Sequence, residues 1–351
     1  MTTSPDDEAT VIIRTVGALG RIELNKPKAI NALSTDMVQT IDRALRQWAT
    51  DTQVAAVLIT GRGERGLCAG GDIKAIHRDL TEGANAGNMT FWADEYAMNH
   101  LIAEYPKPYV AILDGITMGG GVGVSVHGSH RLVTETTKVG MPETGIGLFP
   151  DVGGTYLLAQ LPSEVGMYMG LTGQPVGPGA AIAYGLADTY IDRDRIPELV
   201  EALEAEAFAV DTVIARFAEE APENELSVAE GWIAACFSAD SVVEIIDRLR
   251  QHPNEDAQKT AELLGTKSPR SLAVTFEMIR TAKDMKLEEV LERDLRAASE
   301  IGRRPDLTEG IRAQVIDKDR NPQWDPPTLA GITEDEIRAI LDTEQERTVF
   351  P

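Results

Sequence analysis

A stretch with four glycines in five positions constrains the fold of this chain most strongly. It lies within Gly115–Asp151, which begins GITMGGGVGVSVHG, and it follows the apolar run Tyr109–Leu113 (YVAIL). Glycine has no Cβ, so a backbone of this kind can approach another backbone or a ligand closely. The pattern predicts a buried strand over 109–113, a tight glycine loop, and a helix over 118–126.

Two isolated carboxylates, Glu143 and Asp151, end this stretch in turns bounded by glycine and proline. Burying a carboxylate costs free energy unless it is paired or used, so an acid in an apolar turn is a candidate functional group. Backbone donors that hold an oxyanion, together with an acid that moves protons, are the minimum needed for acyl chemistry. We therefore predict that these residues form an active site.

The remaining chain alternates strand and helix patterns and then becomes helical. Ser34 is a good N-cap for a helix whose apolar face is Met37, Ile41, Leu45 and Trp48. The expected strands are 11–14, 20–24, 54–60, 109–113, 131–134, 138–140 and 187–191. The expected helices include one from Asp72, then 89–105, 209–218, 228–237, 239–251, 255–265, 269–283, 286–301 and 334–341.

This order predicts an α/β protein with a helical C-terminal region. We expect a disordered N-terminus over 1–9, an α/β core over 10–205 and a helical region over 206–351. The chain has 351 residues, of which 43% are hydrophobic, enough for a substantial core.

Composition narrows the partners and the compartment. The net charge of −23 argues against nucleic acid, whose binding requires Lys and Arg, and against an anionic membrane surface. Two cysteines far apart in sequence do not make a disulfide framework, so a reducing compartment is expected. The polar, acidic N-terminus does not resemble a targeting segment. These features predict a cytoplasmic protein.

Three other motifs are better explained by structure than by chemistry. Gly61–Gly66 fits the G-x-G-x-x-G dinucleotide pattern, but its third glycine leads into another loop instead of a helix. His127 and His130 lie three residues apart, but no acidic or cysteine ligand stands at a suitable spacing. Cys68 has no histidine obviously placed to activate it, so we interpret it as a small buried residue.

Three stretches give the chain a resemblance to the crotonase (enoyl-CoA hydratase/isomerase) family. They are Asn25–Leu33 (NKPKAINAL), Leu67–Lys74 (LCAGGDIK), and Gly115–Gly121 with the later Pro142-Glu143 and Phe149–Gly154 (FPDVGG). The resemblance covers about residues 10–200. It implies a spiral of β-β-α turns with two nearly perpendicular sheets and helices behind them.

The resemblance also implies a ligand and an oxyanion hole. The ligand is an acyl-CoA, and the oxyanion donors are the backbone N–H groups of Gly71 and Gly120. Lys26, Lys28 and Lys74 are candidate partners for the CoA phosphates, although a solvated surface explains these lysines equally well. Coenzyme A would be part of the substrate, and no metal or other cofactor is implied.

Departures from the hydratase pattern point to one branch of the family. Hydratases carry a second glutamate just after the glycine run, where this chain has Gly123, and usually a glycine where it has Asp151. These residues and the later segments Leu307–Asp319 and Asn321–Trp324 resemble the 3-hydroxyisobutyryl-CoA hydrolase branch. This resemblance implies thioester hydrolysis of 3-hydroxyisobutyryl-CoA, or a related β-hydroxyacyl-CoA, in valine catabolism.

Several alternatives stay open at this point. Glu143 either activates water or attacks the carbonyl, and Asp151 either orients the substrate hydroxyl or assists proton transfer to the thiolate. Glu95 matches a substrate-contacting glutamate of the hydrolases, or it is a solvent-facing charge. The protein could instead be an enoyl-CoA hydratase or isomerase, or a non-catalytic acyl-CoA binder. The resemblance also leaves a homo-oligomer open.

Overall fold

The structure is a computed structural model that describes residues 9–83, 85–343 and 347–350. The chain divides into two compact units, each built from three separate segments. Unit 1 comprises Met1–Gly71, Ala97–Val139 and Val176–Glu225, and unit 2 comprises Asp72–Tyr96, Gly140–Pro175 and Leu226–Pro351. The segments of the two units alternate along the chain, whereas each predicted domain is a continuous stretch. The predicted boundary at residue 205 stays a prediction. Most of the predicted disordered N-terminus, residues 1–8, lies outside the described residues.

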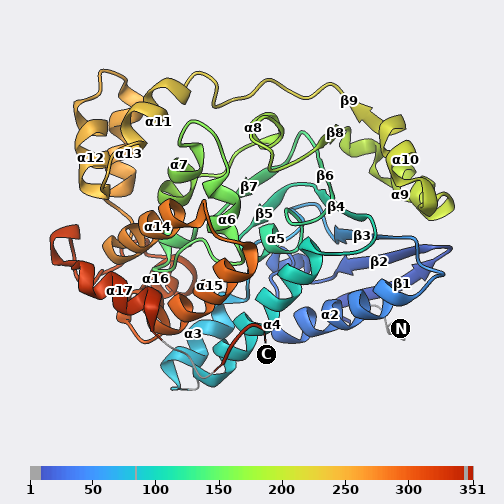
Figure 1. The fold of residues 1–351 in the computed structure, drawn as a ribbon, viewed down its shortest axis with the longest axis horizontal. Helices are drawn as coiled ribbons and strands as arrows, with labels where there is room; N and C mark the ends of the chain where they lie inside the picture. Colours follow the sequence, from blue (N-terminus) through green and yellow to red (C-terminus); the bar gives the residue numbers. More distant parts are fainter. Residues whose placement is uncertain (1–8, 84, 344–346, 351) are drawn as a thin grey trace. The chain divides into compact units, whose positions relative to one another are not determined.

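A seven-stranded mixed sheet forms unit 1, in the order β1-β2-β3-β4-β6-β8-β9 (Figure 1). β1 and β2 form an antiparallel hairpin, the next four pairings are parallel, and β9 returns antiparallel to β8. The strands are β1 (Val11–Val16), β2 (Leu19–Leu24), β3 (Ala56–Gly61), β4 (Tyr109–Leu113), β6 (His130–Val133), β8 (Thr189–Ile191) and β9 (Ala218–Glu219). A second, two-stranded sheet pairs β5 (Ile116–Met118) with β7 (Lys138–Gly140).

Alternate residues of the large sheet pack against two helices of the same unit. Side chains point to opposite faces at successive strand positions, so Leu58 of β3 and Val110 of β4 share one face. They form a buried core cluster with Leu199 and Leu203 of α9 and Val213 of α10. β4 is buried at all five positions, as expected for a strand covered on both faces.

The helices of unit 1 are mostly short. The amphipathic helix predicted after Ser34 is confirmed as α2, and Met37, Ile41, Leu45 and Trp48 are all buried. Ser34 is the N-cap residue, but its side chain makes no capping hydrogen bond. The helical elements are η1 (Pro27–Ala29), α2 (Thr35–Thr50), α5 (Gly120–Gly123), α8 (Pro178–Ala183), η3 (Arg193–Arg195), α9 (Ile196–Ala205), η4 (Ala207–Ala209) and α10 (Val210–Phe217).

Unit 2 is helical. In its C-terminal segment, α14 packs against both short helices α6 and α7, α15 against α6, and α11 and α13 against α7 (Figure 1). α4 (Asn85–Ala103) contributes its residues up to Tyr96 to this unit. The other elements are α3 (Ile73–Thr81), η2 (Glu143–Gly145), α6 (Gly154–Ala159), α7 (Val165–Thr172), α11 (Glu230–Phe237), α12 (Val242–Gln251), α13 (Glu255–Leu264), α14 (Pro269–Ala282), α15 (Leu287–Gly302), α16 (Pro305–Ile311), the π-helix η5 (Arg312–Ile316), η6 (Leu329–Gly331) and α17 (Glu334–Asp342).

The predicted fold class, α/β with a helical C-terminal region, is confirmed. The helix predicted over 118–126 is wrong in extent, because β5 runs to Met118 and α5 covers only Gly120–Gly123 before turns follow. Glycine is a poor helix former, and three of these four residues are glycine. Within the described part of the chain, no helix is both long enough and apolar enough to cross a membrane.

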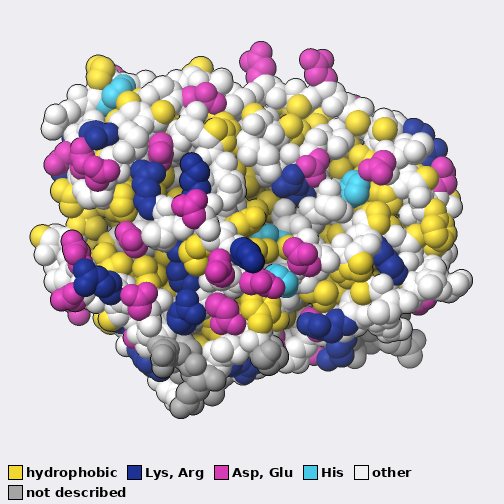
Figure 2. Space-filling model, viewed as in Figure 1, with side chains coloured by type: hydrophobic (Ala, Val, Ile, Leu, Met, Phe, Trp, Pro, Cys, Tyr) yellow, Lys and Arg dark blue, Asp and Glu magenta, His cyan; other side chains and the backbone are white. Residues whose placement is uncertain are grey.

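Charged side chains of both signs are interspersed on the face drawn in Figure 2. Although the net charge is −23, this face is therefore not uniformly acidic. An acidic protein of this kind can still present local basic groups to a phosphate-bearing ligand.

Candidate active site

Gly71 lies in one glycine-rich segment of unit 1 and Gly120, the first residue of α5, in another, and short backbone bridges bring the two segments together. The N–H of Met118 donates to the carbonyl oxygen of Cys68 at 2.9 Å. A Cβ built on Gly70 would lie 3.7 Å from the amide nitrogen of Gly120. The two glycine loops predicted from sequence are thus neighbours in the same unit.

The local backbone explains the glycine run. Gly119 has φ +53° and ψ −121°, a conformation that side-chain-bearing residues avoid, and it caps α5. Gly120 is the first residue of α5, and the first N–H groups of a helix have no partner inside the helix. The role of Gly71 and Gly120 as oxyanion donors stays a prediction.

We expect Gly121→Ala to destabilise the protein. A Cβ at position 121 would lie 2.4 Å from the carbonyl oxygen of Cys68, so one of the two backbones must shift. Overpacking of this kind typically costs about 1–3 kcal/mol, which urea denaturation can measure. Gly231→Ala on α11 is the matched control, because nothing lies within 4 Å of its added Cβ. Equal stability of Gly121→Ala and wild type would contradict the tight contact.

Two of the three candidate phosphate lysines are exposed to solvent. Lys28 and Lys74 are exposed, and Lys26 is partly buried at the start of η1. Lys26 and Lys28 belong to unit 1, whereas Lys74 lies on α3 of unit 2. Exposure is compatible with phosphate binding and with a solvated surface, so their role stays a prediction.

Glu95, Glu143 and Asp151 are three buried carboxylates of unit 2. Their exposed fractions are 2%, 6% and 6%. Glu95 lies on α4, Glu143 begins η2, and Asp151 lies in the loop before α6. The alternative that Glu95 is a solvent-facing charge is therefore wrong. Glu143 Oε2 and Glu95 Oε1 have no hydrogen-bond partner among the described residues.

Tyr96 and Asp294, which were not predicted from sequence, hold the loop that carries Asp151. The Tyr96 hydroxyl donates to Asp151 Oδ2 at 2.8 Å, and both groups are buried. The N–H of Gly153 donates to Asp294 Oδ2 of α15 at 2.9 Å. Tyr96 directly follows the candidate residue Glu95 in the sequence. This adjacency was the only indication that Tyr96 could belong to the site.

Burial and mutual repulsion raise the pKa values of the three carboxyl groups. For Asp151, burial raises the pKa to about 6, although the hydrogen bond from Tyr96 lowers it. For Glu143, burial and then the charge of Asp151 raise the pKa well above its ordinary value. The same two causes raise the pKa of Glu95. The three groups therefore titrate as one coupled cluster.

A coupled cluster of this kind can act as both acid and base near neutral pH. The ionised form of Asp151, whose pKa is about 6, disfavours ionisation of the two glutamates. Carboxylic acids with raised pKa values are suited to proton transfer, because their pKa values approach the operating pH. The arrangement suits activation of water or transfer of a proton to a leaving group.

The three discarded motifs have structural roles. Gly61 ends β3, and the next helix begins only at Ile73, so no helix N-terminus follows the glycine pattern. His130 Nε2 lies 2.9 Å from Asp211 Oδ1 within unit 1. Cys68 is fully buried, and its thiol donates to the carbonyl oxygen of Asn31 at 3.3 Å.

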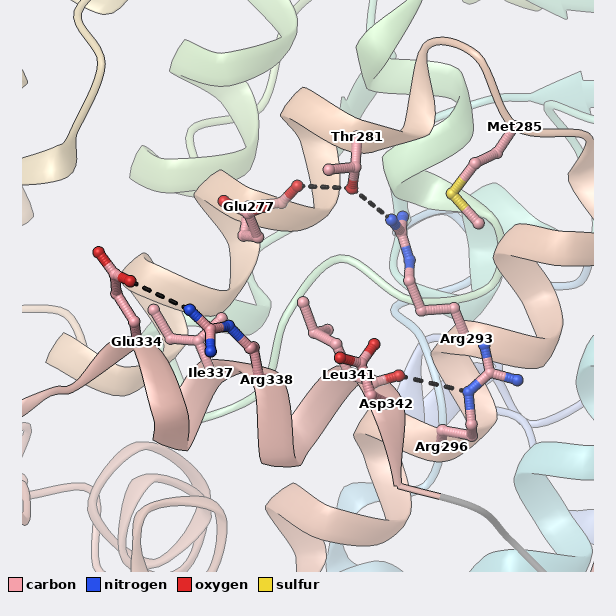
Figure 3. Close-up of a pocket in the computed structure, with 10 residues that line it drawn as sticks. All are labelled: Glu277, Thr281, Met285, Arg293, Arg296, Glu334, Ile337, Arg338, Leu341 and Asp342. Carbon is pink, nitrogen blue, oxygen red and sulfur yellow. Dashed lines mark hydrogen bonds and ion pairs between the residues drawn. The ribbon is translucent and has the colours of Figure 1, made fainter.

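A pocket of about 550 Å³ lies among α14, α15 and α17 (Figure 3). Its charged lining comprises three arginines and three acidic residues, so it favours neither sign of charge. The lining residues are Glu277, Thr281, Met285, Arg293, Arg296, Glu334, Ile337, Arg338, Leu341 and Asp342. They include none of the three cluster carboxylates, and we do not assign this pocket to the candidate site.

Comparison with known proteins places this arrangement in a family. A curated 3-hydroxyisobutyryl-CoA hydrolase, mitochondrial, from Danio rerio is 39% identical over 349 residues, covering 96% of this chain and 90% of the relative. A solved structure titled a carnitinyl-CoA dehydratase, from Mycobacterium thermoresistibile, is 44% identical with a TM-score of 0.93, covering 97% of this chain and 98% of the other. One titled an enoyl-CoA hydratase, from Rhodobacter sphaeroides, is 41% identical with a TM-score of 0.89, covering 95% and 97%.

The family model for enoyl-CoA hydratase/isomerase matches residues 19–341, which include the glycine loops, the carboxylate cluster and most of the C-terminal helices. This match extends well beyond the three stretches that carried the resemblance in sequence. The chain belongs to the enoyl-CoA hydratase/isomerase family, the crotonase family.

Proposed function

We propose that the protein hydrolyses the thioester of 3-hydroxyisobutyryl-CoA, or of a related β-hydroxyacyl-CoA, to the free hydroxy acid and coenzyme A. The observation that carries the proposal is the composition of the buried cluster. Glu143 interacts electrostatically with Asp151, while position 123, where a hydratase would carry its second glutamate, is glycine. The curated relative from Danio rerio, which bears the name of this hydrolase, supports it over nearly the whole chain.

A second candidate is an enoyl-CoA hydratase or isomerase. The titles of the two solved structures, which are 41% and 44% identical to this chain, favour it. Gly123 counts against hydration by the usual glutamate pair, although an isomerase can work with one carboxylate. A non-catalytic acyl-CoA binder is the third alternative, and it gives no reason to keep carboxylates buried at a free-energy cost.

In the proposed reaction, the N–H groups of Gly71 and Gly120 hold the thioester carbonyl oxygen as it becomes negatively charged. One such donor is typically worth about 10²–10³ in rate. Glu143, in its ionised form, either removes a proton from the attacking water or attacks the carbonyl carbon itself. The C–S bond then breaks and the CoA thiolate takes up a proton. In the second route, water hydrolyses the resulting mixed anhydride.

The other residues bind and orient the substrate. We assign Asp151 to the substrate hydroxyl or to proton transfer toward the departing thiolate, and Glu95 to a substrate contact. Lys26 and Lys28 are the proposed partners of the CoA phosphates.

Thiol release, followed with a chromogenic thiol reagent, tests the proposal. We expect release from 3-hydroxyisobutyryl-CoA and no loss of the enoyl absorbance of crotonyl-CoA. Loss of that absorbance without thiol release would show a hydratase instead. Inactivity on both substrates, with acyl-CoA binding retained in calorimetry, would favour the binder.

The setting of the reaction is also proposed. Hydrolysis needs no cofactor, since coenzyme A is part of the substrate. We propose a role in valine catabolism and a cytoplasmic location, without nucleic acid or membrane partners. The name of the Danio rerio relative includes "mitochondrial", so fractionation of the native cells is the direct test of location. A homo-oligomer stays a prediction, which light scattering tests.

A further inference from the structure

The loop that carries Asp151 contains a backbone conformation that needs support. Val152 has φ +53° and Gly153 has φ +72°, both in the left-handed region. A β-branched residue such as valine strongly disfavours this region. Strained backbone of this kind persists only where the surrounding structure holds it. The strain lies directly after the candidate catalytic carboxylate.

Neighbouring residues of α15 hold this turn. Asp294 is fully buried and accepts the N–H of Gly153 at 2.9 Å. Arg293 is 5% exposed, and its Nη2 donates to Thr155 Oγ1 at 3.2 Å. One turn of α15 therefore binds both the strained turn and the first turn of α6.

Arg293 is itself anchored to α14. Its Nη1 donates to Thr281 Oγ1 at 2.6 Å, and its Nη2 donates to the carbonyl oxygen of Met278 at 3.0 Å. Figure 3 shows the guanidinium reaching from α15 toward Thr281. The segment of α15 that holds the turn is thus fixed against a second helix of the same unit.

Asp151 is consequently held at two points. Tyr96 of α4 holds its carboxylate, and Asp294 holds the main chain two residues later. Asp294 also interacts electrostatically with both Asp151 and Tyr96, so it belongs to the same buried region as the cluster. Two hydrogen bonds from different helices thus hold this short loop.

We propose that Asp294 is a positioning residue for Asp151, which it serves by accepting the Gly153 N–H and thereby holding the left-handed turn at Val152 and Gly153. This proposal rests on the function proposed for Asp151. It goes beyond that function by giving the helical C-terminal region a part in catalysis. The contact of Asp294 with the loop is made to its main chain.

Two substitutions of similar branching test the proposal. Asp294→Asn keeps an oxygen that can accept the Gly153 N–H, whereas Asp294→Leu has a similarly branched but somewhat larger side chain without an acceptor. We expect Asp294→Leu to lower kcat by about 10²-fold, because displacing a catalytic group by about 1 Å can cost this much in rate. KM should change less. The kcat of Asp294→Asn should be at least about tenfold higher than that of Asp294→Leu. Asp284→Asn, at an exposed position of the same unit, is the control.

A double-mutant cycle separates positioning from a general structural role. If Asp294 acts through Asp151, Asp151→Asn combined with Asp294→Leu should be no slower than Asp151→Asn alone. If the fold-losses of kcat in the two single variants multiply in the double variant, the proposal is overturned. A kcat for Asp294→Leu within about twofold of wild type would also overturn it. If Asp294→Leu does not fold, Asp294→Ala takes its place in the same cycle.

Hydrogen exchange provides a readout that does not depend on activity. The backbone amides of residues 147–157 should exchange faster in Asp294→Leu than in wild type. In Asp294→Asn they should exchange at the wild-type rate. Unchanged exchange in Asp294→Leu would contradict the hold on the turn. If the wild type releases no thiol from any hydroxyacyl-CoA, the proposed function fails, while the exchange result still decides whether Asp294 holds this loop.

Discussion

Glu143→Gln is expected to abolish nearly all thiol release from 3-hydroxyisobutyryl-CoA. Glutamine has the size of glutamate but neither accepts a proton at neutral pH nor attacks a carbonyl. Proton transfer by a positioned side chain typically contributes about 10²–10⁴-fold, and we expect kcat to fall by that factor or more. KM should change less, because the buried carboxylate acts mainly on the reacting atoms. Steady-state kinetics with the chromogenic thiol reagent measures both parameters.

Glu262→Gln is the matched control for this experiment, because Glu262 is an exposed glutamate of α13 in the same unit. It should retain wild-type kinetics. Retention of more than about a tenth of kcat in Glu143→Gln would contradict the proposed role, provided that circular dichroism shows the variant to be folded.

The two routes for Glu143 differ in a covalent intermediate. In the nucleophilic route, the acyl group is attached to the Glu143 carboxylate after the C–S bond breaks. Rapid acid quench followed by peptide mass spectrometry should then detect the acyl mass on the peptide that contains Glu143. Its absence during a burst of thiol release would favour activation of water.

Much of the fold could be predicted because local patterns determined it. The 3.6-residue spacing from Met37 to Trp48 predicted α2, and the uninterrupted apolar run at 109–113 predicted β4 at its observed bounds. The helix over 118–126 was too long, because the apolar pattern of this stretch outweighed the poor helix propensity of its glycines.

The candidate site was predictable only where its chemistry is visible in sequence. Glu143 and Asp151 stand alone among apolar and turn-forming residues, so their burial was expected and is observed. Tyr96 and Asp294 carry no such local signal. They contact the Asp151 loop from 55 and 141 positions away along the chain, and only the folded structure brings these positions together.

The electrostatics of the cluster were equally out of reach. Glu95 lies on a helix with mixed polar and apolar neighbours, a pattern compatible with exposure or burial. Its pKa depends on burial and on the charge of Asp151, which no spacing along α4 reveals. Residue types therefore predicted the kind of chemistry, whereas the raised pKa values follow from burial in the packed unit.

Asp151→Asn is expected to slow thiol release by about 10²-fold and to shift its pH dependence toward lower pH. The loss of rate follows from its proposed role toward the substrate hydroxyl or the departing thiolate. In the wild type, burial and the Asp151 charge raise the pKa of Glu143, so the ionised Glu143 that catalysis requires forms only above the usual range of a glutamate. The acid limb of kcat/KM should lie correspondingly high.

Removing the charge of Asp151 removes one cause of that rise, so Glu143 should ionise at lower pH and the acid limb should move down. Glu95, whose pKa Asp151 also raises, should shift in the same direction, and Asp294 loses the same repulsion. Tyr96→Phe is the comparison, because it removes a hydrogen bond to Asp151 but leaves the carboxyl group in place. If the acid limb of Asp151→Asn stays at the same pH or moves to higher pH, the charge of Asp151 does not control the ionisation of Glu143.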